Sequence, residues 1–207
     1  MTDCSDIYSN DSIQGGGAYI VTATLTAEGS CSEIEYNDAT GDGGGVYAQA
    51  STIYLRDQVE LYHNDAGTGG SGNGGGAYLD DSDLYSDMTH IKYNTAGGHG
   101  GGVYAVNNSI VDMDLGSYTC LSAGCSRLYG NTASSYGGGI YVNDGSVYLD
   151  NTIVQANSGI LGGGLYAYAG SIAVNSSLFA HNDATSGTGD GVRLFSSSSM
   201  RGSGDTW

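Results

Sequence analysis

The chain has 207 residues, 37 of them Gly and none Pro, and its 22 acidic and 5 basic side chains give a formal net charge of -17. Glycine at this level without proline excludes collagen, and the 39% apolar residues and 17 Tyr exclude an ordinary disordered tract. Because nucleic acids and anionic membrane surfaces attract clustered Lys and Arg, the charge argues against both as partners.

A glycine-rich motif recurs along the chain with a period of about 27 residues. Six good copies contain three Gly, then a small or aliphatic residue, then Tyr, and a degraded copy spans residues 189–193. Internal repeats of this length are typical of solenoids and related repeat folds. The six good copies begin at Gly15, Gly43, Gly74, Gly100, Gly137 and Gly162.

Two further columns of residues share this period. An apolar residue stands three positions before each of seven Asn: Asn10, Asn37, Asn64, Asn94, Asn131, Asn157 and Asn182. Eight residues after each glycine triplet stands an aliphatic residue: Leu25, Ile53, Leu84, Ile110, Val147 and Ile172. We interpret the Asn column as structural, because Asn tolerates left-handed backbone and its amide can bond to backbone or to the next Asn.

Short apolar stretches separated by Gly, Asn, Asp and Ser indicate strands joined by turns, and no segment has a sustained helical period. We therefore predict an all-β, single-stranded parallel β-helix with three short strands per coil. One domain over residues 1–207 would contain about six full coils plus partial terminal coils, stacked about 4.8 Å apart. Insertions near 65–73 and 112–123 are predicted loops, and 189–207 is a degenerate terminal coil.

The four cysteines follow the repeat. Cys4 and Cys31 each lie six residues before a column Asn, so they would occupy one column in adjacent coils, within disulfide range. Cys125 lies too many coils from Cys31, so we expect it to pair with Cys120. Two disulfides would place the chain outside the cytosol, on a cell surface or in the extracellular space.

The paired motifs resemble the repeats of polymorphic outer membrane proteins, whose patterns are GGA followed by Ile, Leu or Val, and FxxN. Phe179-Ala180-His181-Asn182 fits the second pattern literally, and the resemblance covers about residues 7 to 191. The resemblance implies a right-handed β-helix that serves as a surface-exposed adhesin and is exported as an autotransporter passenger.

The tyrosines of the motif form a candidate binding column. Since side chains alternate along a strand, small and aliphatic neighbours would face inward and the tyrosines outward. Such a strip could bind a sugar chain or pack on a protein, although Tyr also simply suits an exposed strand face. The column consists of Tyr19, Tyr47, Tyr78, Tyr104, Tyr141 and Tyr166.

Catalytic and metal sites have weaker signatures. Acidic residues cluster at predicted turns, as in 38–42 and 80–83, where calcium could bridge stacked coils or the carboxylates could simply be solvated. His63, His90, His99 and His181 have no metal or triad spacing, and His63 and His181 are interpreted as turn residues. We assign no catalytic residue, no metal ligand and no cofactor.

The sequence thus indicates a secreted or cell-surface structural or adhesive β-helix that binds a protein or glycan and does not insert into the membrane. The terminal residues resemble partial coils, so the β-helix could continue either in a longer parent chain or into a further copy stacked head to tail. A first alternative is therefore a subunit of an extracellular filament. The tetraserine 196–199 could instead be a polar cap. A second alternative is a polysaccharide lyase or hydrolase of β-helix type.

Overall fold

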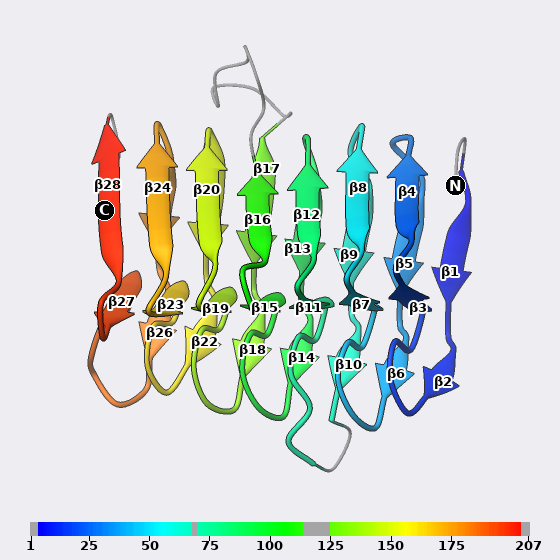
Figure 1. The fold of residues 1–207 in the computed structure, drawn as a ribbon, viewed down its shortest axis with the longest axis horizontal. Coiled ribbons are helices and arrows are strands. Elements are labelled where there is room, and N and C mark those ends of the chain that lie inside the picture. Colours follow the sequence, from blue (N-terminus) through cyan, green and yellow to red (C-terminus); the bar gives the residue numbers. More distant parts are fainter. Residues whose placement is uncertain (1–3, 68–69, 114–124, 204–207) are drawn as a thin grey trace.

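The computed structural model describes residues 4–67, 70–113 and 125–203. In these ranges the chain is all-β and winds through seven coils, with the first and last coils at opposite ends of the rod (Figure 1). Every strand pairs in parallel with the equivalent strands of the adjacent coils, which gives four seven-stranded sheets. The described residues contain no helix suited to crossing a membrane. The predicted parallel β-helix is confirmed, with four strands in each coil rather than three.

We name the sheets A to D in the order in which each coil visits them. Sheet A contains β1 (Asp6–Tyr8), β5 (Glu33–Glu35), β9 (Glu60–Tyr62), β13 (His90–Lys92), β17 (Ser126–Tyr129), β21 (Thr152–Gln155) and β25 (Leu178–Ala180). Sheet B contains the two-residue strands β2 (Asp11–Ser12), β6 (Asp38–Ala39), β10 (Asp65–Ala66), β14 (Thr95–Ala96), β18 (Thr132–Ala133), β22 (Ser158–Gly159) and β26 (Asp183–Ala184). These short strands are the elements that the sequence patterns did not predict.

The glycine triplets precede sheet C, and the aliphatic column lies in sheet D. Sheet C contains β3 (Ala18–Val21), β7 (Val46–Gln49), β11 (Ala77–Asp80), β15 (Val103–Val106), β19 (Ile140–Asn143), β23 (Leu165–Tyr168) and β27 (Val192–Phe195). Sheet D contains β4 (Thr24–Glu28), β8 (Thr52–Arg56), β12 (Asp83–Ser86), β16 (Ile110–Met113), β20 (Ser146–Asp150), β24 (Ser171–Asn175) and β28 (Ser199–Ser203).

The core is a stack of aliphatic side chains inside the coils, and the inner ones are fully buried. One predicted column needs a correction in the fourth coil. Val111, not Ile110, pairs with Leu84 and Val147, while Ile110 pairs with Asp83 and Ser146. The turn before β16 contains both Asn107 and Asn108 in left-handed conformation, and this turn moves the inward position one residue along the chain.

The turn from sheet A to sheet B rests on the Asn column. Asn64 Oδ1 accepts hydrogen bonds from the backbone N–H of Asn37 at 3.1 Å and from its Nδ2 at 3.0 Å, and Asn94 repeats these bonds with Asn64. From Asn37 onward, each Asn also donates from Nδ2 to a carbonyl of the preceding coil, as Asn64 does to Ile34 at 2.9 Å. The inner Asn side chains are buried, so these bonds satisfy groups that would otherwise destabilise the fold.

Left-handed backbone at this turn belongs to the residue before each Asn, not to the Asn itself. Tyr36, His63 and Tyr93 have φ of 51°, 51° and 54°, and His181 has 54°. The interpretation of His63 and His181 as turn residues is therefore confirmed. A non-glycine residue in the left-handed conformation costs roughly 1–2 kcal/mol, and the hydrogen bonds along the buried Asn column, which we call the Asn ladder, offset this cost.

Serines repeat the same device at the turn from sheet C to sheet D. Ser51 Oγ accepts from the N–H of Ala23 at 3.1 Å, Ser82 Oγ from Ser51 at 3.0 Å, and Ser109 Oγ from Ser82 at 3.0 Å. Their period is hidden in the sequence because Ser is common in turns of every kind.

The glycine triplets form the turn into sheet C. Gly43 has φ of +70°, and a Cβ on Gly44 would lie 2.5 Å from the carbonyl oxygens of both Asp65 and Gly75. Neighbouring coils therefore approach too closely here for any side chain, which explains why the motif repeats.

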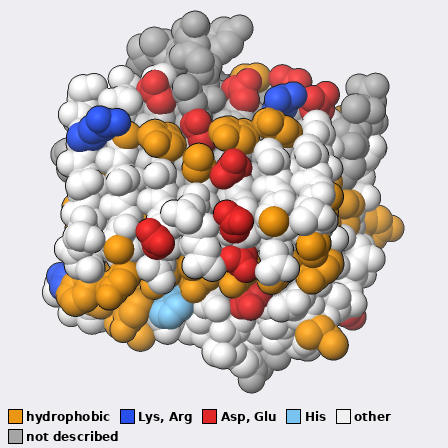
Figure 2. Space-filling view, in the orientation of Figure 1, with side chains coloured by type: hydrophobic (Ala, Val, Ile, Leu, Met, Phe, Trp, Pro, Cys, Tyr) orange, Lys and Arg blue, Asp and Glu red, His pale blue; other side chains and the backbone are white. Residues whose placement is uncertain are grey.

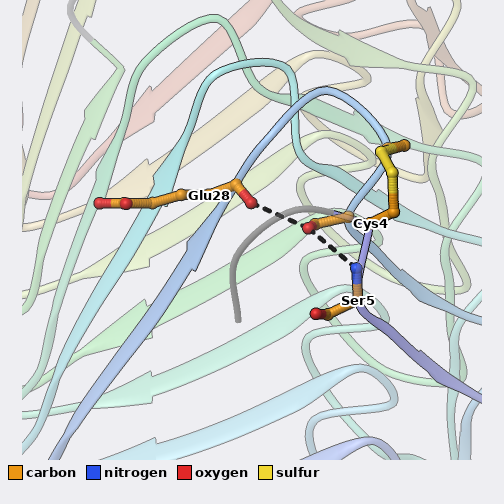
Figure 3. The surroundings of a disulfide bond; sticks show 5 residues. Cys4, Ser5 and Glu28 are labelled. Carbon is orange, nitrogen blue, oxygen red and sulfur yellow. Dashed lines mark hydrogen bonds between the residues drawn. A yellow bond between two sulfur atoms is a disulfide. The ribbon is translucent and has the colours of Figure 1, made fainter.

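A disulfide joins the first two coils. Cys4 and Cys31 are bonded, with Cα atoms 4.5 Å apart, as their shared column predicted. Figure 3 shows the hydrogen bonds beside them, in which Ser32 Oγ accepts from the Ser5 N–H at 3.3 Å and donates to the Glu28 carbonyl at 2.8 Å. The predicted Cys120–Cys125 pair lies outside the described residues because Cys120 does.

The last coil keeps strands in all four sheets although its glycine motif is degraded. Ser199–Ser203 forms β28, in which Met200 pairs with Ile172 and packs against the core. Ser198 belongs to the preceding turn, where its Oγ accepts from the Gly170 N–H at 3.1 Å. The tetraserine thus supplies the turn and the first residue of a strand that continues sheet D.

Candidate binding surface

The predicted tyrosine column forms on the outer side of sheet C, but it is not an exposed strip. Adjacent rings stack with centroids 4.9 to 5.5 Å apart and nearly parallel planes. Tyr47 and Tyr166 are only 7% and 6% exposed, and Tyr19 at the end of the column is the one exposed member. The expectation of a six-residue exposed strip was therefore wrong.

The loops between sheets B and C add to this burial. His99 stacks on Tyr141 at 4.8 Å and on Tyr136 at 4.9 Å, and Tyr136 stacks on Tyr166 at 4.9 Å. His99 Nδ1 lies 3.2 Å from the backbone N–H of Tyr136, from which it accepts a hydrogen bond. Burial among these rings lowers the pKa of His99 and raises the pKa of Tyr141 to about 12. The column is thus part of the packing rather than an open platform.

A second aromatic group lies at the turn from sheet A to sheet B, and it is exposed. Tyr36, His63 and Tyr93 precede successive column Asn residues, and their rings stack at 5.0 and 5.3 Å. Tyr36 is 52% exposed and Tyr93 43% exposed. Because the left-handed backbone turns the column Asn inward, these rings stand on the outside of the corner.

Two tyrosines of sheet A pack edge-on against this stack. Tyr62 makes edge contacts with Tyr36 at 5.6 Å and with His63 at 5.2 Å, and Tyr129 makes one with Tyr93 at 5.2 Å. The ring of Tyr93 also lies over Gly130, where a Cβ would come within 2.7 Å of it. We call Tyr36, Tyr62, His63, Tyr93 and Tyr129 the corner cluster.

A hollow of about 300 Å³ opens beside the corner cluster. It is lined by Glu60, His90, Lys92, Tyr93, Arg127 and Tyr129. Lys92 Nζ lies 2.7 Å from Glu60 Oε1 and 5.0 Å from the centre of the Tyr62 ring, and His90 Nδ1 lies 3.2 Å from the same carboxylate oxygen. The hollow therefore combines aromatic edges with cationic side chains on one sheet face.

Charge changes sign along the outer face of sheet A. Asp6, Glu33 and Glu60 occupy one column in the first three coils, followed by His90 and Arg127 in the next two. Burial, followed by repulsion from Glu35, Glu60 and Asp6, raises the pKa of Glu33. Burial also acts to raise the pKa of Glu60, but hydrogen bonds from Lys92 and His90 outweigh it and lower that pKa.

Acidic side chains also lie on the other sheets and turns. Figure 2 shows carboxylates spread over one face and the few Lys and Arg side chains toward its margins. In the acidic turn at 80–83, where either calcium binding or simple solvation was expected, Asp80 carboxylate oxygens accept hydrogen bonds from Asn107 at 2.6 Å and Gln49 at 3.2 Å. Within the described ranges, no group of three or more His, Cys, Asp and Glu side chains could hold a metal ion.

Comparison with family models, curated proteins and solved structures gave no match for this chain. Its candidate site therefore depends on the geometry described above. Sequence patterns missed the corner cluster because its members share no motif. The one available signal is that Tyr36, His63 and Tyr93 directly precede consecutive column Asn residues.

Proposed function

We propose that this chain is a secreted or cell-surface β-solenoid with a structural and adhesive role, which binds a glycan or protein through the corner cluster. The observation that carries the proposal is a cluster of five aromatic rings packed on one another at a single corner of the rod, three of them exposed and two half-buried. Exposed aromatic groups of this kind are a common feature of binding sites, since each ring offers a large contact area.

The rest of the molecule supports a scaffold role. The Cys4–Cys31 disulfide is consistent with an oxidising compartment. The Asn and Ser ladders hold successive coils in register, so side chains on adjacent strands keep a constant spacing along the rod. Such a rigid array suits a repetitive or extended partner.

The experiment is a binding screen with a triple variant, Tyr36→Ser with His63→Ser and Tyr93→Ser. Purified protein is passed over immobilised neutral and acidic polysaccharides and over immobilised matrix proteins. We expect the wild type to be retained on at least one of these surfaces and the triple variant to lose that retention while its circular dichroism is unchanged. Retention of the triple variant, or failure of the wild type to bind any surface, contradicts the proposal.

A matched control removes the same kind of side chain elsewhere. Tyr54, Tyr85 and Tyr148 lie in line on the outer side of sheet D, and Tyr54 stacks on Tyr85 at 5.5 Å. Replacing these three by Ser should leave retention intact. An equal loss in both variants would show general stickiness of tyrosine rather than a site.

A second function, head-to-tail stacking of copies, is favoured by the two end coils. β1–β4 and β25–β28 are the outermost strands of their sheets, and among the described residues nothing pairs with their outer edges. Phe179 would meet Ile7, and Leu194 would meet Ile20, if coil one of a second copy followed coil seven. Phe179 and Ile7 belong to one inward column and Leu194 and Ile20 to another, so both end coils would contribute apolar side chains to the contact.

Sedimentation velocity tests this second function. We expect concentration-dependent association of the wild type and its loss in Leu194→Asp, because a carboxylate on the end face would be buried without a partner. A strictly monomeric wild type at the highest attainable concentration rules stacking out.

A further inference from the structure

The hollow beside the corner cluster holds an unusual concentration of positive charge for this chain. Lys92 and Arg127 are two of its five basic residues, and His90, on the same strand as Lys92, pairs with Arg127 on the adjacent strand. Glu60 is the one carboxylate that lines the hollow, so these groups carry a net charge of at least +1 with His90 neutral. In a chain of net charge -17, this is where an anionic group meets attraction instead of repulsion.

Of the basic groups in the hollow, Arg127 retains unused capacity to bind an anion. Arg127 is exposed and forms none of the ion pairs found among the described residues, so its guanidinium can bind a carboxylate with two hydrogen bonds. His90 donates from Nδ1 to the Glu60 carboxylate, so Nε2 of the neutral ring is an acceptor and offers no bond to an anion. Arg127 is therefore the group that an incoming carboxylate would pair with.

We propose that the hollow binds the carboxylate of an acidic sugar, with Arg127 donating hydrogen bonds to the acid group and the sugar ring packing against Tyr93 and Tyr129. This inference rests on the proposed function and names its ligand class. A sugar fits better than an acidic peptide because the cations and the tyrosine edges share one hollow of about 300 Å³, and each uronic residue presents a carboxylate beside an apolar ring face. Successive residues of the glycan would lie along Tyr93, His63 and Tyr36.

Calorimetric titration tests the acid group. The probes are uronic acid oligomers of three kinds, from galacturonate, hyaluronan and alginate, and the methyl esters of the same oligomers. The ester keeps the sugar and removes the charge. We expect at least one acid oligomer to bind and its ester to bind about tenfold more weakly, the effect of losing one charge-assisted hydrogen bond.

Arg127→Gln tests the protein side, with Arg56→Gln as its matched control. Both variants remove one positive charge, but Arg56 pairs with Glu28 at 3.2 Å and lies on sheet D, away from the hollow. We expect Arg127→Gln to weaken acid binding about tenfold and to bind the ester as the wild type does, while Arg56→Gln changes neither. Binding should also weaken with added salt in the wild type and less so in Arg127→Gln.

Each contrary outcome has a definite meaning. If no acid oligomer binds, or if ester and acid bind equally, the acidic-sugar inference is overturned. If a polyglutamate peptide of similar length binds as tightly as the best acid oligomer, the ligand class is wrong, although the anion site remains. The proposed adhesive function fails separately, when the triple variant at Tyr36, His63 and Tyr93 is still retained on the surfaces that hold the wild type.

Discussion

The tyrosine column on sheet C and the corner cluster are built from the same ring stacking, yet one is covered and the other is exposed. Rings in both repeat from coil to coil at about 5 Å. The residues beside them differ. Six residues, 40–45, connect β6 to β7 beside the column, whereas only Tyr36 and Asn37 connect β5 to β6 at the corner.

Loop length, rather than residue type, therefore decides which aromatic repeat is exposed to a binding partner. Longer loops carry groups such as His99 and Tyr136 onto the column. In a two-residue turn no side chain is available to cover the rings, because Asn37 points into the stack of Asn side chains and Tyr36 points outward. Stacking at the corner therefore orders the rings without hiding their edges.

Asn94→Ala should reduce the free energy of unfolding by roughly 3 kcal/mol or more, because it leaves buried donors and acceptors unsatisfied. Asn94 is fully buried, and it bonds to Asn64, Asn131 and the Leu61 carbonyl. Denaturant unfolding measures the loss. Asn10→Ala, at the exposed end of the ladder, is the control and should cost far less; equal losses would contradict a cooperative ladder.

Tyr141→Ser should cost roughly 3 kcal/mol, the scale for truncating a buried aromatic side chain. Its ring is 9% exposed and stacks on Tyr104, Tyr166 and His99. The same denaturant experiment applies, and binding to any ligand of the corner should persist in the folded variant. A neutral effect on stability would mean that the column does not contribute to packing.

Tyr93→Ser should cost only about 1 kcal/mol, since the ring is exposed and loses mainly its contacts with His63 and Tyr129. Ligand retention should fall even so. Tyr141→Ser is thus expected to lose stability and keep binding, whereas Tyr93→Ser is expected to lose binding and keep most of its stability. If Tyr141→Ser lost binding and Tyr93→Ser lost stability, the tyrosine column would be the binding surface and the corner cluster would be part of the packing.

The smallest effect concerns pH. Burial lowers the pKa of His99 in the folded state, so below about pH 6.5 the unfolded chain takes up a proton that folded His99 resists. Stability should therefore fall as pH drops from about 7.5 to 5.5, and less so in His99→Phe. Thermal unfolding of both proteins at the two pH values measures this, and identical pH slopes would refute the contribution of His99.

Much of the scaffold could be predicted from the sequence because a constant period forces equivalent residues into register. The Cys4–Cys31 pair, the Asn ladder and the parallel stacking all follow from equal spacing to a landmark residue. Prediction failed where one residue was added, as before Val111, and for two-residue strands too short to show a period. The candidate site was harder to predict because its residues keep the repeat positions but differ in type from coil to coil.

The sequence by itself determined that this chain is a parallel β-solenoid, because only in-register coils bury every aliphatic column at once. Which aromatic column is exposed was decided by the tertiary structure alone. Exposure depends on how far the neighbouring loops reach, and the period does not encode that. The hollow at Arg127 is likewise a tertiary feature, since it joins Glu60, His90 and Arg127, which share a column position but no chemistry.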